Sequence, residues 1–460
     1  MNEAGIKASF KAYDIRGCVP DELDEEFAVN LALALAAEFA PKRVVVGRDV
    51  RLSGPSLVAA FAGSLAGQGV ELTDIGVCGT EEIYFAAGSE NFDLGLVFTA
   101  SHNPAEYNGI KLVKAGAVPV SRDSGLFAVR DRMLNRDYKA YSGASGRVVQ
   151  GSFRNNYLDF LLQNAQNAPR LKVVMNPGNG CAWPVLEKLL PQIPNIEPVL
   201  INAEPDGNFP NGVPNPLLPE RRADTARAVL KHGADLGLAW DGDFDRCFFF
   251  DSEGKFVESY YLIGLFARNI LDANPGAKVI HDTRLYWNTR EMVKNAGGEA
   301  VMGKTGHAFM KERMRAENAV FGGEMSAHFY FKDFYCCDSG MLPWLKLLEI
   351  MAKSGKSLGH LVGERVSRFP CSGEINFKVE NAAQVVEKIH DFYKKDIFEE
   401  NRIDGLDADC GEWRFNLRSS NTEPLLRLNV ESWGDAELML EKTQQIQELI
   451  QKQGGTLTNG

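Results

Sequence analysis

Short apolar runs alternate along this chain with longer segments in which apolar residues recur every three or four positions. The runs are rich in Val, Ile and Leu, as in "RVVVGRD" from Arg43, and such runs are typical of buried strands. The longer segments include Glu25–Phe39 and Leu57–Gly67, whose spacing predicts helices. This alternation predicts α/β layers with largely parallel sheets.

One internal repeat is visible within this pattern. "DLGLVFTASH" begins at Asp93, and "DLGLAWDGDF" begins at Asp235. Each comes after another strand-like run that ends in a glycine-containing turn, "RVVVGRD" from Arg43 and "LKVVMNPGNG" from Leu171. The shared order indicates two copies of one α/β unit.

A weaker third copy pairs "KVIHDTR" from Lys278 with "AVFGGEMSAH" from Ala319. Three units with one plan would carry their polar loops at equivalent strand ends, where α/β sheets gather ligands. We therefore expect the three loops to face one cleft.

The chain after Glu374 has a different pattern, which predicts a small α+β domain with antiparallel strands. Its expected elements are a helix over Ala382–Tyr393, strands at "WRFNLR" and "LLRLNVES", and a closing helix over Ala436–Lys452. The expected fold class is therefore α/β, with three related α/β domains of mixed, largely parallel sheets and a smaller C-terminal α+β domain around one central cleft. Turn-rich stretches place the domain boundaries at 1–148, 149–252, 253–367 and 368–460.

Length and charge narrow the classes of function. At 460 residues, with 45% hydrophobic and 24% charged residues, the chain has the composition of a folded multidomain protein. A net charge of −11 gives no basic footprint for nucleic acid. The start lacks a signal-peptide pattern and no apolar stretch approaches the length of a membrane span. We expect a cytoplasmic protein that binds neither nucleic acid nor membrane. A monomer is the expected oligomeric state.

The cysteines show no pattern for zinc or for redox chemistry. The chain has 8 of them, without a paired CxxC spacing. Their positions are Cys18, Cys78, Cys181, Cys247, Cys336, Cys337, Cys371 and Cys410. We expect reduced thiols with mostly structural roles.

The segment "DGDFDR" places three carboxylates at alternate positions, Asp241, Asp243 and Asp245, directly after the apolar run Leu236–Trp240. Carboxylates this close repel one another unless a hard cation neutralises them, and oxygen ligands of this kind suit Mg²⁺. A solvated acidic turn is the simpler alternative, although the buried strand before it argues against that interpretation.

Two other interpretations of the acidic segment can be tested on the sequence. An EF-hand needs Gly at its sixth position and Glu at its twelfth, where Arg246 and Ser252 stand, so that interpretation fails. A phosphatase that uses Asp241 as a covalent nucleophile stays open, since a strand followed by DxD suits such a site. Arg246 itself could bind a phosphate oxygen beside the metal or form a surface salt bridge.

Three further loops carry candidate chemistry, each beside a plainer turn interpretation. "RSSNTEP", from Arg418, has the donors of a phosphate cradle. "GGEMSAH" offers Glu324 and Ser326 on the same side of an expected extended stretch, with His328 close by, and this suits sugar hydroxyls. "FTASHNP" places Ser101 at a strand end, as a nucleophile, a phosphate carrier or a turn residue.

These loops, in this order, resemble those of the α-D-phosphohexomutase family. The motifs are "YDIRG" at Tyr13, "TASHNP" at Thr99, "DGDFDR" at Asp241, "GEMSAH" at Gly323 and "RSSNTEP" at Arg418. The resemblance implies three related α/β domains and a smaller fourth domain around one cleft, in agreement with the repeat. It also implies reversible phosphoryl transfer between the 1- and 6-positions of hexose phosphates.

The resemblance assigns Ser101 as a phosphoserine, which passes its phosphoryl group to a hexose monophosphate through a hexose 1,6-bisphosphate that also serves as activator. Mg²⁺ would be held by the phosphate on Ser101 and by the aspartates of "DGDFDR". Arg16 and Arg246 would neutralise phosphate charge. Lys111 matches a family lysine and is expected to transfer protons, with a pKa lowered by nearby cations.

The remaining roles implied by the resemblance concern substrate binding. Residues matched to the phosphate not being transferred are Arg418, Ser420, Asn421 and Thr422, and residues matched to sugar contacts are Glu324, Ser326 and His328. His307, in "KTGH", is expected as a catalytic residue that contacts substrate and helps with proton transfer, whereas His102 is expected to support the serine loop. Ala327 occupies a place often filled by Gly.

The "GEMS" form resembles the bacterial phosphomannomutase/phosphoglucomutase branch that acts on glucose and mannose phosphates, since phosphoglucosamine mutases usually carry Gln at the place of Met325. A Mg²⁺-dependent sugar-phosphate phosphatase and a non-catalytic sugar-phosphate sensor are the rival functions. The preference between glucose and mannose is not visible in any motif.

Overall fold

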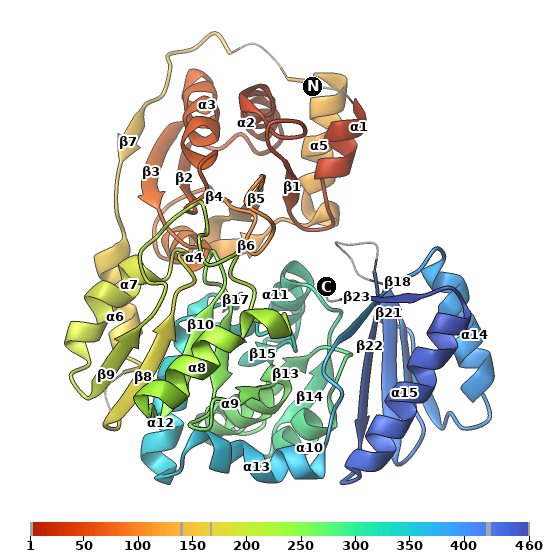
Figure 1. Cartoon of the computed structure of the whole chain (residues 1–460). Helices are drawn as coiled ribbons and strands as arrows, with labels where there is room; N and C mark the ends of the chain where they lie inside the picture. The colour runs from red at the N-terminus through yellow and green to blue at the C-terminus, as the bar shows by residue number, and fades with distance from the viewer. Residues whose placement is uncertain (1–2, 139–140, 166–167, 420–424, 459–460) are drawn as a thin grey trace. The chain divides into compact units, whose positions relative to one another are not determined.

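The structure is a computed structural model that describes residues 3–138, 141–165, 168–419 and 425–458 (Figure 1). The chain forms two compact units. Unit 1 comprises Met1–Lys255 and His328–Ser354, and unit 2 comprises Phe256–Ala327 and Gly355–Gly460.

The first sheet of unit 1 is mixed, with the order β1-β5-β4-β2-β3-β7 and β6 paired to β5. Its strands are β1 (Ile15–Cys18), β2 (Arg43–Arg48), β3 (Glu71–Val77), β4 (Leu94–Phe98), β5 (Tyr107–Lys114), β6 (Val118–Pro119) and β7 (Val148–Gln150). Strands β4, β2, β3 and β7 pair in parallel, whereas β5 is antiparallel to both β4 and β1.

Helices cover both faces of this sheet, which explains why β2 is apolar at consecutive positions. Val44 and Val46 pack in a core that includes residues of α2, α3 and α5, whereas Val45 is buried on the opposite face. There α4 lies against β4, with Ile83 in contact with Gly95. The helices are α1 (Glu3–Ser9), α2 (Glu25–Phe39), α3 (Gly54–Gly67), α4 (Thr80–Ser89) and α5 (Leu126–Asn135).

The second sheet of unit 1 repeats part of this plan. Strand β10 pairs in parallel with β8 and antiparallel with β11, and β8 pairs in parallel with β9. The remaining elements of unit 1 are β8 (Leu171–Asn176), β9 (Ile196–Leu200), β10 (Leu236–Trp240), β11 (Cys247–Phe250), β16 (Phe329–Phe331), β17 (Cys337–Asp338), α6 (Arg154–Leu162), α7 (Trp183–Leu189), α8 (Ala223–His232) and α12 (Leu342–Ser354).

Unit 2 begins with a third parallel set, in which β13 pairs with β14 and with β15. The elements are β12 (Phe256–Val257), β13 (Lys278–His281), β14 (Glu299–Met302), β15 (Phe321–Gly323), α9 (Ser259–Ala273), α10 (Trp287–Asn295), α11 (His307–Glu317) and α13 (Leu358–Arg368).

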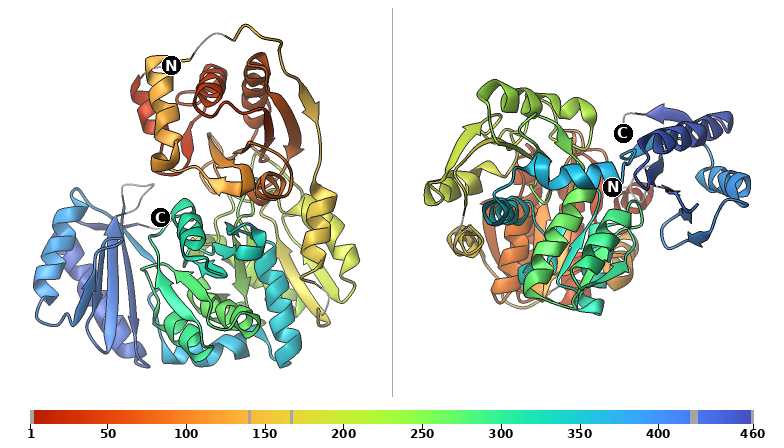
Figure 2. Two further views of the ribbon diagram at one scale, coloured as in Figure 1. Left: turned by 180° about the vertical axis from the view of Figure 1, so that it is seen from behind. Right: turned by 90° about the horizontal axis from the view of Figure 1, so that it is seen from below.

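The C-terminal part of unit 2 is an antiparallel sheet with the order β19-β20-β21-β22-β18-β23. Helices α14 and α15 cover one of its faces, as both views in Figures 1 and 2 show. The elements are β18 (Ile375–Lys378), β19 (Glu399–Asn401), β20 (Leu406–Asp409), β21 (Trp413–Ser419), β22 (Leu425–Ser432), β23 (Thr456–Thr458), α14 (Ala382–Tyr393) and α15 (Ala436–Lys452).

The internal repeat is confirmed by strand order. In each α/β set the first strand lies between its two parallel partners, as β3-β2-β4, β9-β8-β10 and β14-β13-β15. The loops that carry Ser101, Asp241 and Glu324 follow β4, β10 and β15, the equivalent strands of the three sets. The fold class is therefore confirmed as three related α/β domains with mixed sheets and a C-terminal antiparallel domain.

Most helix bounds predicted from the pattern agree with the structure, including those of α2, α14 and α15. Helix α3 begins at Gly54 rather than at Leu57, because Pro55 stands in its first turn, where proline is tolerated. All 8 cysteines lie in described ranges and are free thiols. None of the described helices is long and apolar enough to cross a membrane.

One local prediction was wrong. The segment from Glu324 to Ala327 is a tight turn rather than an extended stretch, since Ala327 N–H donates to the Glu324 carbonyl at 3.1 Å. Ala327 has φ of +70°, a left-handed conformation that glycine adopts with less strain. This explains why glycine suits the position.

Candidate active site

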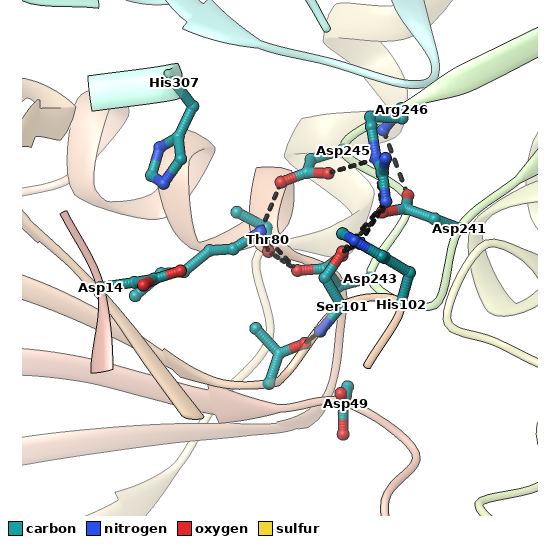
Figure 3. Close-up of polar contacts among 12 residues, drawn as sticks. Asp14, Asp49, Thr80, Ser101, His102, Asp241, Asp243, Asp245, Arg246 and His307 are labelled. Carbon is teal, nitrogen blue, oxygen red and sulfur yellow. Dashed lines mark hydrogen bonds and ion pairs between the residues drawn. The ribbon is translucent and has the colours of Figure 1, made fainter. Parts of the chain in front are cut away.

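Ser101 lies in unit 1, three residues after the end of β4, in a left-handed conformation with φ of +50°. Its N–H donates to Thr99 Oγ1 at 2.9 Å, and its hydroxyl donates to Asp241 Oδ2 at 2.7 Å (Figure 3). The side chain is almost fully buried. The serine hydroxyl is thus fixed against the aspartate cluster that follows β10.

Arg51 binds the backbone of the serine loop, a role that the sequence reasoning missed. Its Nε donates to Asp49 Oδ2 at 3.1 Å, and the side chain is 1% exposed. The two outer nitrogens donate to the backbone carbonyls of Ser101 (3.1 Å), Asn103 (2.6 Å), Pro104 (2.6 Å) and Tyr107 (2.8 Å). A planar fork with five N–H donors is suited to this number of partners.

Backbone contact between the two loops requires a glycine at position 242. A Cβ atom there would lie 2.6 Å from the Ser101 carbonyl oxygen, closer than two non-bonded heavy atoms approach. The glycine of "DGD" therefore has a role of its own between the two carboxylates. It allows the loop Asp241–Asp245 to contact the backbone of the serine loop.

The carboxylates of Asp241, Asp243 and Asp245 are fully buried, and each offers an oxygen within 4.8 Å of the others. Lys111 Nζ donates to Asp243 Oδ2 at 2.7 Å and to Asp245 Oδ2 at 2.5 Å. Thr80, at the start of α4, donates to Asp243 Oδ2 at 2.5 Å and was also missed by the sequence reasoning. The fold therefore places one lysine and three aspartates in a single buried cluster.

The hydrogen bonding of the aspartate cluster, and not only its residue types, fits a divalent cation. Asp243 Oδ1 is buried without a hydrogen-bond partner among the described residues, although a buried carboxylate oxygen ordinarily has one. The lysine ammonium between two aspartates is a positive group at the place where a cation would be attracted. Oxygen-only donors of this kind match the preference of Mg²⁺.

Burial and charge shift the titration of this cluster. Burial raises the pKa of Asp241, and although Arg246 opposes this effect, Asp245 and Asp243 add to it, so that the pKa reaches about 7. Burial alone would lower the pKa of Lys111, but the carboxylates of Asp243 and Asp245 outweigh burial and raise it above its usual range. The expected lowering of the Lys111 pKa is therefore wrong for the cluster as it stands, because its nearest charges are negative.

Arg246 and His102 flank the serine hydroxyl. Arg246 Nε donates to Asp241 Oδ2 at 2.9 Å, and its NH2 lies 3.5 Å from Ser101 Oγ. His102 Nδ1 lies 3.0 Å from the same hydroxyl. Burial and the neighbouring Arg246 lower the pKa of His102 well below its usual range, so the imidazole is neutral at pH 7.

Arg16, on β1, reaches the serine loop through one neighbour. Its NH1 donates to Asn103 Oδ1 at 2.5 Å, and its Nε donates to Asp14 Oδ2 at 2.8 Å. The guanidinium is 14% exposed, so solvent and ligands have access to it. Arg16 is therefore fixed beside the serine loop while part of its guanidinium group remains exposed.

His328 belongs to unit 1 and lies beside the loop Asp241–Asp245. Its Nε2 is 3.7 Å from Asp245 Oδ1 and 3.8 Å from Asp338 Oδ2. The sequence associated it with Glu324 and Ser326, which lie in unit 2. Asp338, on β17, was not singled out by the sequence.

A second polar cluster lies in unit 2, around Arg284. Its Nε donates to Asp282 Oδ2 at 2.7 Å, and its NH2 donates to Ser326 Oγ at 3.3 Å. Glu324 Oε1 lies 3.7 Å from the same NH2 and accepts from the N–H of Gly306 at 2.8 Å. The two residues matched to sugar contacts therefore share one arginine, which stands in the "HDTR" segment after β13 and was missed.

Arg418, near the end of β21, joins this cluster through Glu374. Its NH2 donates to Glu374 Oε2 at 3.4 Å, and the side chain is 2% exposed. His307 begins α11, and its Nδ1 lies 3.3 Å from Lys311 Nζ. Ser420, Asn421 and Thr422 lie outside the described residues.

Four family models match the chain in the order expected from its domains. They are described as phosphoglucomutase/phosphomannomutase alpha/beta/alpha domain I (residues 7–139), domain II (155–254), domain III (258–369) and the C-terminal domain (374–448). Together they cover most of the chain. It belongs to the phosphoglucomutase/phosphomannomutase family.

Whole-length relatives agree with this family. A chain named phosphohexose mutases from Xanthomonas campestris pv. campestris is 53% identical over 444 residues, which cover 96% of this chain and 99% of the relative. A phosphomannomutase from Escherichia coli (strain K12) is 49% identical over 448 residues, with coverage of 96% and 98%. The crystal structure of a phosphoglucomutase/phosphomannomutase family protein from Burkholderia thailandensis has a TM-score of 0.87 at 32% identity, covering 98% of this chain and 99% of that one.

Family membership defines the reaction class. This member of the phosphoglucomutase/phosphomannomutase family is an isomerase that carries out intramolecular phosphoryl transfer in hexose phosphates. The phosphatase interpretation is not favoured. Asp241 Oδ2 already accepts from Ser101 and Arg246, and Oδ1 accepts from the Arg246 N–H at 3.3 Å, so this carboxylate is engaged rather than presented as a nucleophile.

Proposed function

We propose that this enzyme interconverts the 1- and 6-phosphates of glucose and mannose, with Ser101 as the phosphoryl carrier. The observation that carries the proposal is the 2.7 Å hydrogen bond from Ser101 Oγ to Asp241 Oδ2. It puts the one serine hydroxyl of the family motif at a buried carboxylate cluster that fits a cation. A phosphoryl group on that hydroxyl would be neutralised and oriented there.

The proposed reaction has two transfers in opposite directions. In the first, the bond between phosphorus and Ser101 Oγ breaks while a sugar hydroxyl oxygen forms its bond to phosphorus, and the hydroxyl proton goes to a base. The product of this half-reaction is a hexose 1,6-bisphosphate. In the second, Ser101 Oγ takes the other phosphoryl group, and the released sugar oxygen regains a proton.

The aspartate cluster is proposed to hold Mg²⁺ through Asp241, Asp243 and Asp245, together with an oxygen of the phosphate on Ser101. When bound, the ion would neutralise charge on the phosphate oxygens. The aspartates keep Ser101 Oγ in place and exclude water from the buried side of the phosphate, since all three are fully buried.

Cationic side chains are proposed to share the remaining charge and the protons. Arg246, 3.5 Å from Ser101 Oγ, stabilises the serine oxygen as it leaves. Arg16, which reaches the loop through Asn103, contacts the phosphate from the exposed side. Lys111 is proposed as the proton-transfer group and His307 as a secondary contact to substrate.

Substrate recognition is proposed to use unit 2. Glu324 and Ser326 would bind sugar hydroxyls, and Arg284 would support both through its contacts to Ser326 Oγ and Glu324 Oε1. His328, which belongs to unit 1, is proposed as a further sugar contact. The phosphate not being transferred would bind Arg418, Ser420, Asn421 and Thr422.

The finer properties rest on the relatives and on the "GEMS" loop. Relatives named phosphomannomutase support mannose phosphates as substrates, and the loop form supports glucose phosphates as well. We propose a hexose 1,6-bisphosphate as activator, because unphosphorylated Ser101 needs a phosphoryl donor. A monomer in the cytoplasm is the proposed state.

The decisive experiment measures product formation from glucose 1-phosphate, mannose 1-phosphate and glucosamine 1-phosphate, each with Mg²⁺ and a trace of the matching bisphosphate. Isomerisation of the first two with slow turnover of the third supports the proposal. Intact-protein mass spectrometry should show one phosphoryl group, lost in Ser101→Ala.

Two outcomes would count against the proposal. Net release of inorganic phosphate with an acid-labile acyl phosphate at Asp241 would favour hydrolysis. Binding of all three sugars without turnover by the Mg²⁺-loaded, bisphosphate-treated protein would favour a sensor. Ser89→Ala is a matched control, because Ser89 Oγ donates to the Phe85 carbonyl within α4.

A further inference from the structure

Three arginines of unit 2 converge on a single carboxylate. Glu374 Oε2 lies 3.3 Å from Arg284 NH1 and 3.4 Å from Arg418 NH2, and Glu374 Oε1 lies 3.2 Å from Arg427 NH1. The three guanidinium groups come from the loop after β13 and from β21 and β22. Such a convergence of forked cations is the arrangement by which proteins bind phosphate.

Glu374 remains charged in this environment. Burial alone would raise its pKa, but Arg427, Arg284 and Arg418 outweigh burial and hold the pKa at about 2. Its side chain is 15% exposed and that of Arg427 is 18% exposed. The carboxylate is therefore an anion at neutral pH. Solvent reaches the cluster at Glu374 and Arg427, whereas Arg284 and Arg418 are each 2% exposed.

The contacts to Glu374 are of a kind that a ligand can replace. They join side chain to side chain at 3.2 to 3.4 Å, whereas charge-assisted bonds of optimal geometry are about 2.7–2.9 Å long. Arg284 keeps a separate and shorter bond from Nε to Asp282 at 2.7 Å. Loss of the Glu374 contact would leave Arg284 anchored and its NH1 available.

We propose that Glu374 is an internal anion that occupies the phosphate-binding arginines between ligands and yields them to the phosphate of a hexose phosphate. This inference rests on the proposed function, because it takes Arg418 as a phosphate ligand. A phosphate monoester dianion carries more charge and more acceptor oxygens than a carboxylate, so it competes successfully for three guanidinium groups.

The exchange has a consequence for the reaction cycle. The bisphosphate formed in the first transfer must give up its contacts and bind again in the opposite orientation before the second transfer. A carboxylate that takes over the arginines during this interval lowers the free-energy cost of leaving three cations unpaired. Glu374 therefore weakens phosphate binding and speeds reorientation.

The test compares Glu374→Gln with the wild-type enzyme in three measurements: the affinity for inorganic phosphate by calorimetry, the kcat and KM for glucose 1-phosphate, and the fraction of bisphosphate released per turnover. Removal of the competing charge should tighten phosphate binding about tenfold, which corresponds to about 1.4 kcal/mol. KM and kcat should fall together, because substrate is held more tightly while reorientation slows.

Glu291→Gln is the matched control. Glu291 also lies between two arginines, 2.8 Å from Arg365 and 2.6 Å from Arg368, and among the described residues no ion pair joins it to Arg284, Arg418 or Arg427. Its phosphate affinity should equal that of the wild type. Glu374→Asp keeps the charge on a shorter side chain and should bind phosphate with intermediate affinity, which preserves the test if Glu374→Gln fails to fold.

Unchanged or weaker phosphate binding in Glu374→Gln and Glu374→Asp would overturn the inference and make Glu374 a structural support of the arginines. Arg418→Ala separates this failure from failure of the proposed function. If Arg418→Ala loses phosphate affinity while the Glu374 variants do not gain it, only the inference fails. If Arg418→Ala also binds phosphate like the wild type, the proposed phosphate site itself is wrong.

Discussion

The first and third α/β sets contain the same local turn with different partners. After β2, Asp49 accepts from the N–H of Arg51 at 2.9 Å and from its Nε at 3.1 Å. After β13, Asp282 accepts from the N–H of Arg284 at 3.1 Å and from its Nε at 2.7 Å. An Asp-x-Arg sequence after equivalent strands thus folds in the same way in both units.

The outer nitrogens of the two arginines differ in what they bind. Those of Arg51 donate to four backbone carbonyls of the serine loop. Those of Arg284 contact side-chain oxygens, including those of Ser326 and Glu374. One arginine is therefore part of the scaffold, and the other presents its charge to groups that a ligand can replace.

The difference arises from the loops that follow. The chain between β4 and β5 is long enough to fold back, so its carbonyls turn towards Arg51. The loop after β15 closes at once through the hydrogen bond from Ala327 to Glu324 and leaves side chains rather than carbonyls beside Arg284. Identical turns thus acquire different functions from the length and shape of a neighbouring segment.

Loss of the Arg51 side chain should have the largest effect. Arg51→Ala leaves Asp49 buried without its guanidinium partner and removes one donor from each of four carbonyls, so we expect a loss of about 3–5 kcal/mol in the free energy of unfolding. Urea denaturation measures it, and mass spectrometry should find no phosphoryl group at Ser101. Arg122→Ala, at an exposed pair with Asp123, should stay within about 0.5 kcal/mol of wild type. Equal stability of both variants would contradict the scaffold role.

Arg284→Lys should separate binding from stability. Lysine keeps a charge near Asp282 but lacks the two outer nitrogens, of which NH2 reaches Ser326 and NH1 reaches Glu374. We therefore expect KM for glucose 1-phosphate to rise about tenfold to a hundredfold. Melting temperature should change little, in contrast with Arg51→Lys. Arg368→Lys, whose side chain is 50% exposed, is the control for the same chemical change. A loss of stability as large as that of Arg51→Lys would make the two arginines equivalent.

The Mg²⁺ affinity of the aspartate cluster in unit 1 should depend on pH. Asp241 has its pKa raised to about 7, so below that pH a proton must leave before a cation binds. Apparent Mg²⁺ affinity should therefore fall about tenfold per pH unit below 7 and level off above 8. Calorimetry in buffers of different ionisation enthalpy should count nearly one proton released at pH 6. An affinity for Mg²⁺ that does not change with pH would contradict the raised pKa.

The smallest effect is expected at Ala327, in the turn beside Arg284. Ala327→Gly relieves a left-handed backbone at φ of +70° but adds freedom to the unfolded chain, so the net stabilisation should lie between zero and about 1 kcal/mol. Ala316→Gly in α11 should have the opposite sign, since glycine in a helix costs about 1 kcal/mol relative to alanine. Destabilisation of both variants by the same amount would show that the turn is unstrained.

The sequence predicted the helices α2, α14 and α15 and the aspartate cluster, because each depends on a pattern local to the chain. It did not predict Arg51, whose four acceptors lie about 50 residues further along. The expected lowering of the Lys111 pKa was wrong for a related reason, since the sequence matched the lysine to a motif but not to the two aspartates that surround it and raise its pKa.

The sequence by itself determined the repeated strand and loop order, the family motifs and the residue types of the site. Periodicity and motif spacing depend only on neighbours along the chain, so these features are visible without coordinates. The tertiary structure decided which partner each charged side chain meets: Arg51 the backbone, Arg284 other side chains, Glu374 three arginines. Charge effects act over a few ångströms in space, and segments far apart in sequence become neighbours only in the folded chain.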